Sequence, residues 1–98
     1  MMDLVRQLAI SEVVFERKRQ DELWGDQSDR PLFERLSVLV EEVGELAEAI
    51  NETCLDNPPH PNRGGVALIQ REATHVAAVA VSIIEAVTRR QAADRSNT

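Results

Sequence analysis

The sequence predicts an all-α fold in which antiparallel helices form the core of a four-helix bundle that oligomerisation completes. Three long segments with helical periodicity cover most of the 98 residues, and two polar loops separate them. The third segment is apolar on nearly every side, so other helices must cover it all round. Two helices of one short chain can hardly do so. We therefore expect one domain, residues 1–98, that assembles as a homodimer or homotetramer.

The first helix is expected from about Asp3 to Trp24, where Gly25 can end it in a left-handed conformation. Apolar positions recur along it at steps of three and four residues, on one stripe of Leu4, Leu8, Ser11 and Phe15 and on another of Ile10, Val13 and Val14. This recurrence is typical of a helix. The polar stretch 25–31 that follows predicts a loop.

The second and third helices are expected from about Leu32 to Leu55 and from about Val66 to Arg90. The apolar stripe of the second helix consists of Leu36, Leu39, Val40, Val43, Leu46, Ala47 and Ile50. Residues 56–65 hold three prolines and two glycines, which predicts a loop. The β-branched centre of the third helix would also permit a strand, but about 25 residues without Gly or Pro are too many for one. The polar tail from about 91 to 98 is expected to fray.

Charge and composition exclude several classes of partner. The formal net charge of −6 argues against nucleic acid and anionic membranes, both of which need clustered Lys and Arg. A nucleotide is compatible with it, because acidic side chains reach phosphates through a divalent cation. The single cysteine, Cys54, rules out an intramolecular disulfide and fits a reducing compartment. Since no unbroken apolar run reaches the ~18–20 residues of a membrane span, we expect a cytoplasmic protein.

Three carboxylates of the second helix lie close together in Val-Glu-Glu-Val-Gly-Glu, residues 40–45. Glu42 and Glu45 are three residues apart and Glu41 and Glu45 four apart, so their side chains can converge. Like charges at this spacing repel by roughly 0.2–0.5 kcal/mol per pair, and a divalent cation reverses that cost. Gly44 lowers helix stability by about 1 kcal/mol, which indicates close approach of another helix or a ligand. The alternative is a solvated acidic face.

Glu72 falls on the apolar stripe of the third helix, and His75 follows one turn later. A buried carboxylate is costly unless it is paired or bound to a metal ion. His75 can reach the same point, since residues three apart are neighbours on a helix surface. The alternatives are a buried salt bridge from Glu72 to Arg17 or Arg19, and a hydrogen-bonded core histidine.

Together these features resemble the MazG-like family of all-α NTP pyrophosphohydrolases. The hallmark of that family is an EExxE motif on one helix and an ExxD motif on a following antiparallel helix. The residues that match it are Glu41, Glu42 and Glu45 for the first motif and Glu72 for the start of the second. His75 stands where the family has Asp. The resemblance spans about residues 12–87, and the chain looks like a short branch of the family associated with phages and mobile elements.

The resemblance implies that an NTP or dNTP is cleaved between the α and β phosphorus to the monophosphate and pyrophosphate, as nucleotide-pool housecleaning. It implies that Glu42, Glu45 and Glu72 bind Mg²⁺, and that Glu41 or Glu42 orients or deprotonates the attacking water. His75 would be a further ligand, and imidazole suits Mn²⁺ better than Mg²⁺. This departure leaves three interpretations open: a changed metal preference, a weaker site, or nucleotide binding without hydrolysis.

Three residues of the first helix are candidates for substrate binding. Trp24 could stack on a nucleobase, Gln20 could hydrogen-bond the base edge, and Arg17 could meet phosphates. The alternatives are a tryptophan packed on the core and a solvated basic patch that pairs with the acidic helices. Two other functions stay open: a non-catalytic nucleotide or metal sensor on the same fold, and a helical protein-interaction module whose apolar third helix docks a partner.

Overall fold

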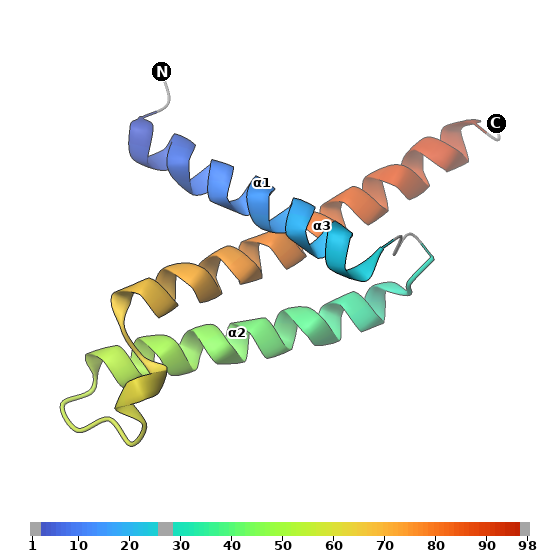
Figure 1. Cartoon of the computed structure of the whole chain (residues 1–98). Coiled ribbons are helices and arrows are strands. Elements are labelled where there is room, and N and C mark those ends of the chain that lie inside the picture. Colours follow the sequence, from blue (N-terminus) through green and yellow to red (C-terminus); the bar gives the residue numbers. More distant parts are fainter. Residues whose placement is uncertain (1–2, 26–28, 97–98) are drawn as a thin grey trace.

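The structure is a computed structural model that describes residues 3–25 and 29–96. These residues fold into three α-helices and contain no strand. The elements are α1 (Leu4–Trp24), α2 (Leu32–Cys54), a 3₁₀ turn η1 (Pro61–Arg63) and α3 (Val66–Ser96). α2 and α3 run antiparallel and side by side, and α1 crosses over α3 (Figure 1). The predicted all-α fold is confirmed, and the first two helices end within one residue of the predicted positions.

The connection between α2 and α3 is tied to the last turn of α2. The carboxylate of Glu52 accepts a hydrogen bond from the backbone N–H of His60 at 2.9 Å, and the Thr53 hydroxyl accepts one from the backbone N–H of Gly65 at 2.7 Å. Gly64 passes so close to α2 that a Cβ there would lie 2.9 Å from the carbonyl carbon of Glu52. This approach requires glycine, and it fixes where α3 starts relative to the end of α2.

α1 packs on α3 through its polar face. Its buried residues are Glu16 and Gln20, whereas Phe15 of the predicted apolar stripe is 75% exposed. The reason is electrostatic, because Arg17 on the polar face reaches Glu85 of α3 in an ion pair of 2.8 Å. The apolar stripe of α1 is therefore left exposed, and two of its residues, Leu8 and Phe15, line an open cavity between α1 and α3.

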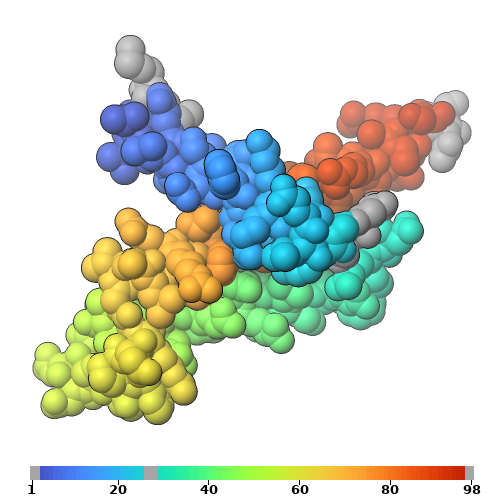
Figure 2. Space-filling view, viewed as in Figure 1, coloured from blue at the N-terminus to red at the C-terminus, as the bar shows by residue number. Residues whose placement is uncertain are grey.

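A single chain leaves much of its apolar surface uncovered. Among the described residues, the buried hydrophobic side chains are all small, namely Ala49, Ala78, Val79 and Ala86. The accessible surface is 7379 Å², against about 5,600 Å² expected for a compact monomer of 10.9 kDa. The radius of gyration is 16.3 Å, against about 13 Å expected for this length. In the space-filling view, α1 and the C-terminal part of α3 stand apart as two arms (Figure 2).

α3 is longer than the sequence predicts. It continues to Ser96, six residues past Arg90, because Gln, Ala and Arg dominate this stretch and Gly and Pro are absent from it. The predicted end of this helix is therefore six residues short, while residues 97–98 lie outside the described part. By length and composition α3 could cross a membrane. A criterion that requires a long unbroken apolar run does not identify this helix. The core helix of a soluble protein passes the same test.

Candidate metal centre

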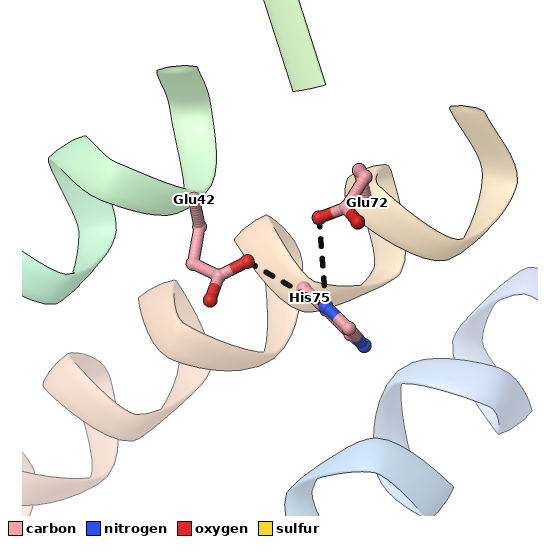
Figure 3. A group of neighbouring side chains, drawn as sticks. All are labelled: Glu42, Glu72 and His75. Atoms are coloured by element: carbon pink, nitrogen blue, oxygen red, sulfur yellow. Dashed lines mark ion pairs between the residues drawn. The ribbon is translucent and has the colours of Figure 1, made fainter. Parts of the chain in front are cut away.

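Glu42 of α2 meets Glu72 and His75 of α3 where the two antiparallel helices pack (Figure 3). Nδ1 of His75 lies 3.5 Å from Oε2 of Glu42 and 3.6 Å from Oε2 of Glu72. One potential ligand atom from each of the three residues falls within a group no more than 4.8 Å across. Three of the four metal ligands expected from the sequence are thus brought together.

Two carboxylate oxygens of this cluster are buried without a hydrogen-bond partner. They are Oε2 of Glu42 and Oε2 of Glu72, the atoms that face His75. At 3.5 and 3.6 Å, the contacts to His75 are too long for good hydrogen bonds, so the attraction is electrostatic. A buried carboxylate oxygen left unsatisfied is costly, and a cation between the two oxygens would remove that cost.

The spacing of the three ligand atoms fits a divalent ion. Two ligands of one Mg²⁺ ion lie at most about 4.2 Å apart, which is twice the usual ligand distance of about 2.1 Å. The observed group is at most 4.8 Å across, so small side-chain movements close it. Two carboxylates and one imidazole are a donor set that Mg²⁺ accepts and that Mn²⁺ accepts more readily.

Glu16 of α1 joins the cluster from the other side of the imidazole. Its Oε2 lies 3.7 Å from Nε2 of His75. Arg19 donates to both oxygens of Glu16 at 2.7 Å, and this hydrogen bonding lowers the pKa of Glu16 in spite of burial. Histidines that bind metal usually direct their second nitrogen at a carboxylate or carbonyl, which is the place that Glu16 occupies.

Sequence reasoning missed Glu16. Within α1 it is one acidic residue beside a basic run, and nothing local marks it as buried. Its role depends on the point at which α1 crosses α3, and no local pattern in the sequence indicates that point. Its burial next to His75 makes α1 part of the centre, which was expected to involve the second and third helices alone.

Glu41 and Glu45 flank the cluster on α2 and are exposed. Partial loss of hydration and the nearby carboxylate of Glu72 raise the pKa of Glu45. Burial and the charge of Glu45 likewise raise the pKa of Glu42. Burial is the larger cause of both pKa shifts and the neighbouring carboxylates add to it, and a bound cation would relieve that crowding of negative charge.

The arginines near the cluster are engaged by other carboxylates. Arg17 pairs with Glu85 at 2.8 Å and with Asp21 at 2.9 Å, and Arg19 pairs with Glu16. The alternative prediction that Glu72 forms a salt bridge with one of these arginines is therefore wrong. The neighbour of Glu72 is His75, from its own helix.

A cavity of about 820 Å³ opens beside Glu42, the member of the cluster that lines it, and its volume is within the range of small-molecule sites. Glu41 and Glu42 line it, and so do two of the three predicted substrate-binding residues, Arg17 and Trp24. Trp24 is 50% exposed, which leaves part of its ring accessible. Gln20 does not line the cavity.

The side chain of Gln20 instead forms hydrogen bonds within α1. The residue is 2% exposed, its side-chain oxygen accepts from Arg17 at 3.0 Å, and its side-chain nitrogen donates to Glu16 at 3.3 Å. The predicted contact of Gln20 with a base edge finds no support in this geometry. The residue orders Glu16 and Arg17, the two groups with which α1 reaches α3.

Comparison of the chain with the signatures of known protein families, with curated proteins and with solved structures found no match. The resemblance to the MazG-like family accordingly rests on the motif residues of α2 and α3.

Proposed function

We propose that the protein is a metal-dependent nucleoside triphosphate pyrophosphohydrolase of the MazG-like type. It would convert an NTP or dNTP and water into the monophosphate and pyrophosphate. The observation that carries the proposal is the pair of buried, unsatisfied oxygens of Glu42 and Glu72 beside the imidazole of His75. A nucleotide-sized cavity that Glu41 and Glu42 line supports it further.

Glu42, Glu72 and His75 would hold the metal ion, with Glu45 beside them as a further carboxylate. The mixed carboxylate and imidazole set favours Mn²⁺ over Mg²⁺ relative to an all-carboxylate site. A bound divalent ion supplies neutralisation of the phosphate charge and Lewis acidity toward the phosphate oxygens. Glu16 would keep the imidazole oriented through its second nitrogen.

We assign the general base to Glu41, which is exposed and lines the cavity next to Glu42. Its carboxylate would accept a proton from the attacking water as the water oxygen bonds to the α-phosphorus. The bond from the α-phosphorus to the bridging oxygen breaks, and that oxygen leaves with pyrophosphate. Trp24, on the wall of the same cavity, would stack on the nucleobase.

We further propose that the protein works as a homodimer or homotetramer, in which a second copy completes a four-helix bundle. An exposed stripe of α2, spaced alternately by four and three residues, consists of Leu36, Val40, Val43, Ala47 and Ile50. This is the spacing of a coiled-coil seam. Beside it, a Cβ at Gly44 would meet nothing within 4 Å in a single chain. A second helix packed on the stripe would explain the glycine.

A second candidate function is a nucleotide or metal sensor without hydrolytic activity. The observation that favours it is His75, which approaches three carboxylates at 3.5 to 3.7 Å, those of Glu16, Glu42 and Glu72. A protonated imidazole at this point would take the place of a cation. The fold would then keep its cluster together without the metal that hydrolysis needs.

Pyrophosphate release from a panel of NTPs and dNTPs, with Mg²⁺ and separately with Mn²⁺, tests the proposal. We expect release by the wild type, none by Glu42→Ala, and unchanged release by Glu22→Ala, which removes an exposed carboxylate of α1 outside the cavity. No release with either metal, together with a nucleotide-induced rise in Tm, would favour the sensor. If the protein shows neither release nor stabilisation, both functions are rejected and the interaction module remains.

A further inference from the structure

The polar face of α1 meets α3 at two places, through the neighbouring residues Glu16 and Arg17. Arg17 pairs with Glu85 at 2.8 Å, and Oε2 of Glu16 lies 3.7 Å from Nε2 of His75. The buried residues of α1 are Glu16 and Gln20, both of them polar. The position of α1 on α3 therefore depends in large part on charged and hydrogen-bonding groups.

The imidazole of His75 lies between carboxylates on both of its sides. Nδ1 faces Glu42 at 3.5 Å and Glu72 at 3.6 Å, and Nε2 faces Glu16. A neutral imidazole has one N–H, so one of its two sides turns a lone pair toward a carboxylate. With a cation on the Nδ1 side, that lone pair binds the cation and the proton stays on Nε2, where His75 donates to Glu16.

The carboxylate of Glu16 is tied to its own helix. Arg19 donates to both of its oxygens at 2.7 Å, and the side-chain nitrogen of Gln20 donates to Oε2 at 3.3 Å. Gln20 also accepts from Arg17 at 3.0 Å, which links the two places where α1 meets α3. A stronger contact between Glu16 and His75 therefore acts on α1 as a whole.

α1 in turn forms a wall of the cavity beside Glu42. Arg17, Asp21 and Trp24 of α1 line this cavity, opposite Glu41 and Glu42 of α2. Whatever fixes α1 on α3 therefore also fixes this wall, including the tryptophan proposed to stack on the nucleobase.

We propose that binding of a divalent cation at Glu42, Glu72 and His75 fixes α1 on α3 through Glu16, a positioning residue, and so completes the nucleotide cavity. This coupling rests on the proposed function only through the metal centre, and it does not require hydrolysis. Because coupling between two equilibria is reciprocal, the docked α1 raises the affinity for the cation by the same factor. A nucleotide accordingly binds more tightly after the cation than before it.

Hydrogen exchange followed by mass spectrometry, with Mn²⁺ alone and no nucleotide, tests the coupling. Calorimetry first gives the Kd of each variant, and exchange is then compared without Mn²⁺ and with Mn²⁺ about tenfold above that Kd. In the wild type we expect Mn²⁺ to slow exchange in α1 by at least about fivefold, the lower end of coupling between sites. In Glu16→Ala, Mn²⁺ should bind more weakly and still slow exchange in α2 and α3 around the centre, but not in α1.

Glu12→Ala is the matched control, because it removes an exposed carboxylate one turn earlier on the same helix, and it should behave as the wild type. Circular dichroism identifies variants that fail to fold. If Glu16→Ala is one of them, Glu16→Gln replaces it, and the slowing in α1 should be smaller than in the wild type because the charge is lost.

The outcomes separate the coupling from the proposed function. Bound Mn²⁺ that leaves exchange in α1 unchanged, or that slows it equally in the wild type and the Glu16 variant, overturns the coupling even if nucleotides are hydrolysed. Slowing that depends on Glu16 in a protein that releases no pyrophosphate supports the coupling and overturns the hydrolase. A wild type that binds no Mn²⁺ overturns the coupling together with the metal centre.

Discussion

Glu42 and His75 lie 33 positions apart on antiparallel helices and face each other with 3.5 Å between Oε2 and Nδ1. The oxygen is buried and accepts no hydrogen bond. The two groups are therefore close without being bonded, and a metal ion or a proton between them would add the missing positive charge. A metal ion and a protonated imidazole predict different responses to mutation.

Glu72→Gln should abolish stabilisation by metal. In the wild type we expect Mn²⁺ to raise Tm, because the ion binds the folded cluster and not the unfolded chain. Without the Glu72 carboxylate the shift should disappear, while the Tm of the metal-free protein should stay equal or rise, since crowding of negative charge is reduced. Differential scanning fluorimetry over a Mn²⁺ series measures both effects. Glu22→Gln is the control, and an undiminished shift in Glu72→Gln would remove Glu72 from the metal site.

His75→Asp should change the metal preference. The substitution replaces an imidazole by a carboxylate, which suits Mg²⁺ better relative to Mn²⁺. It also places another negative charge against Glu16, Glu42 and Glu72, so the metal-free variant should melt at a lower temperature. Pyrophosphate release and Tm shifts with each ion measure the preference. An unchanged ratio of the Mg²⁺ and Mn²⁺ responses would show that His75 is no ligand.

The Arg17–Glu85 ion pair should stabilise the packing of α1 on α3 in a pH-dependent way. Hydrogen bonding from Arg17 lowers the pKa of Glu85 below 4.5. A lowered carboxyl pKa contributes stability that is complete above 4.5 and is lost as pH falls through the lowered value. We expect Glu85→Gln to reduce the free energy of unfolding by about 1 kcal/mol at pH 7, and by less at each step below pH 4.5.

Urea unfolding at a fixed protein concentration, from pH 7 to pH 3, measures this difference. Glu22→Gln provides the matched control, because the carboxylate it removes is exposed on the same helix as Arg17. A gap between wild type and Glu85→Gln that keeps its size down to pH 3 would contradict the assigned role of the ion pair.

Val43→Glu should break the proposed oligomer. Val43 is 47% exposed at the middle of the heptad-spaced stripe of α2, so a charge there would be buried against a second helix. We expect light scattering after size exclusion to show a dimer or tetramer for the wild type and a monomer for the variant. Ser37→Glu, at an exposed polar position of α2, should leave the assembly intact. A monomeric wild type would reject the oligomer outright.

The helices and the convergence of Glu42, Glu72 and His75 follow from local pattern. Gly25 and the Pro-rich loop mark helix ends through backbone chemistry, which each residue carries with it. Once two adjacent helices are taken as antiparallel, carboxylates in the middle of each must lie near one another. That these residues bind metal stays a prediction, because proximity alone does not distinguish an ion from a protonated imidazole.

The roles of Glu16 and Glu85 could not be predicted from the sequence, for a common reason. Each acquires its role from a long-range contact that depends on where α1 crosses α3 or on how the cavity between the helices is shaped. Periodicity indicates that a helix has an apolar face, but it does not indicate that α1 would turn its charged face to α3. That choice depends on specific ion pairs such as Arg17–Glu85.

The close approach of Gly64 to Glu52 also sets the rotation of α3 about its own axis, and so which of its residues face α2. α3 begins at Val66, six residues before Glu72, and each residue turns the helix by about 100°. One residue inserted between Val66 and Glu72 would swing Glu72 about 100° around α3 and carry its carboxylate away from α2. A residue inserted into 56–59, ahead of the Gly64 contact, would leave the rotation of α3 unchanged. The geometry of the candidate centre thus depends on the number of residues between the loop and Glu72, although these residues are not themselves proposed ligands.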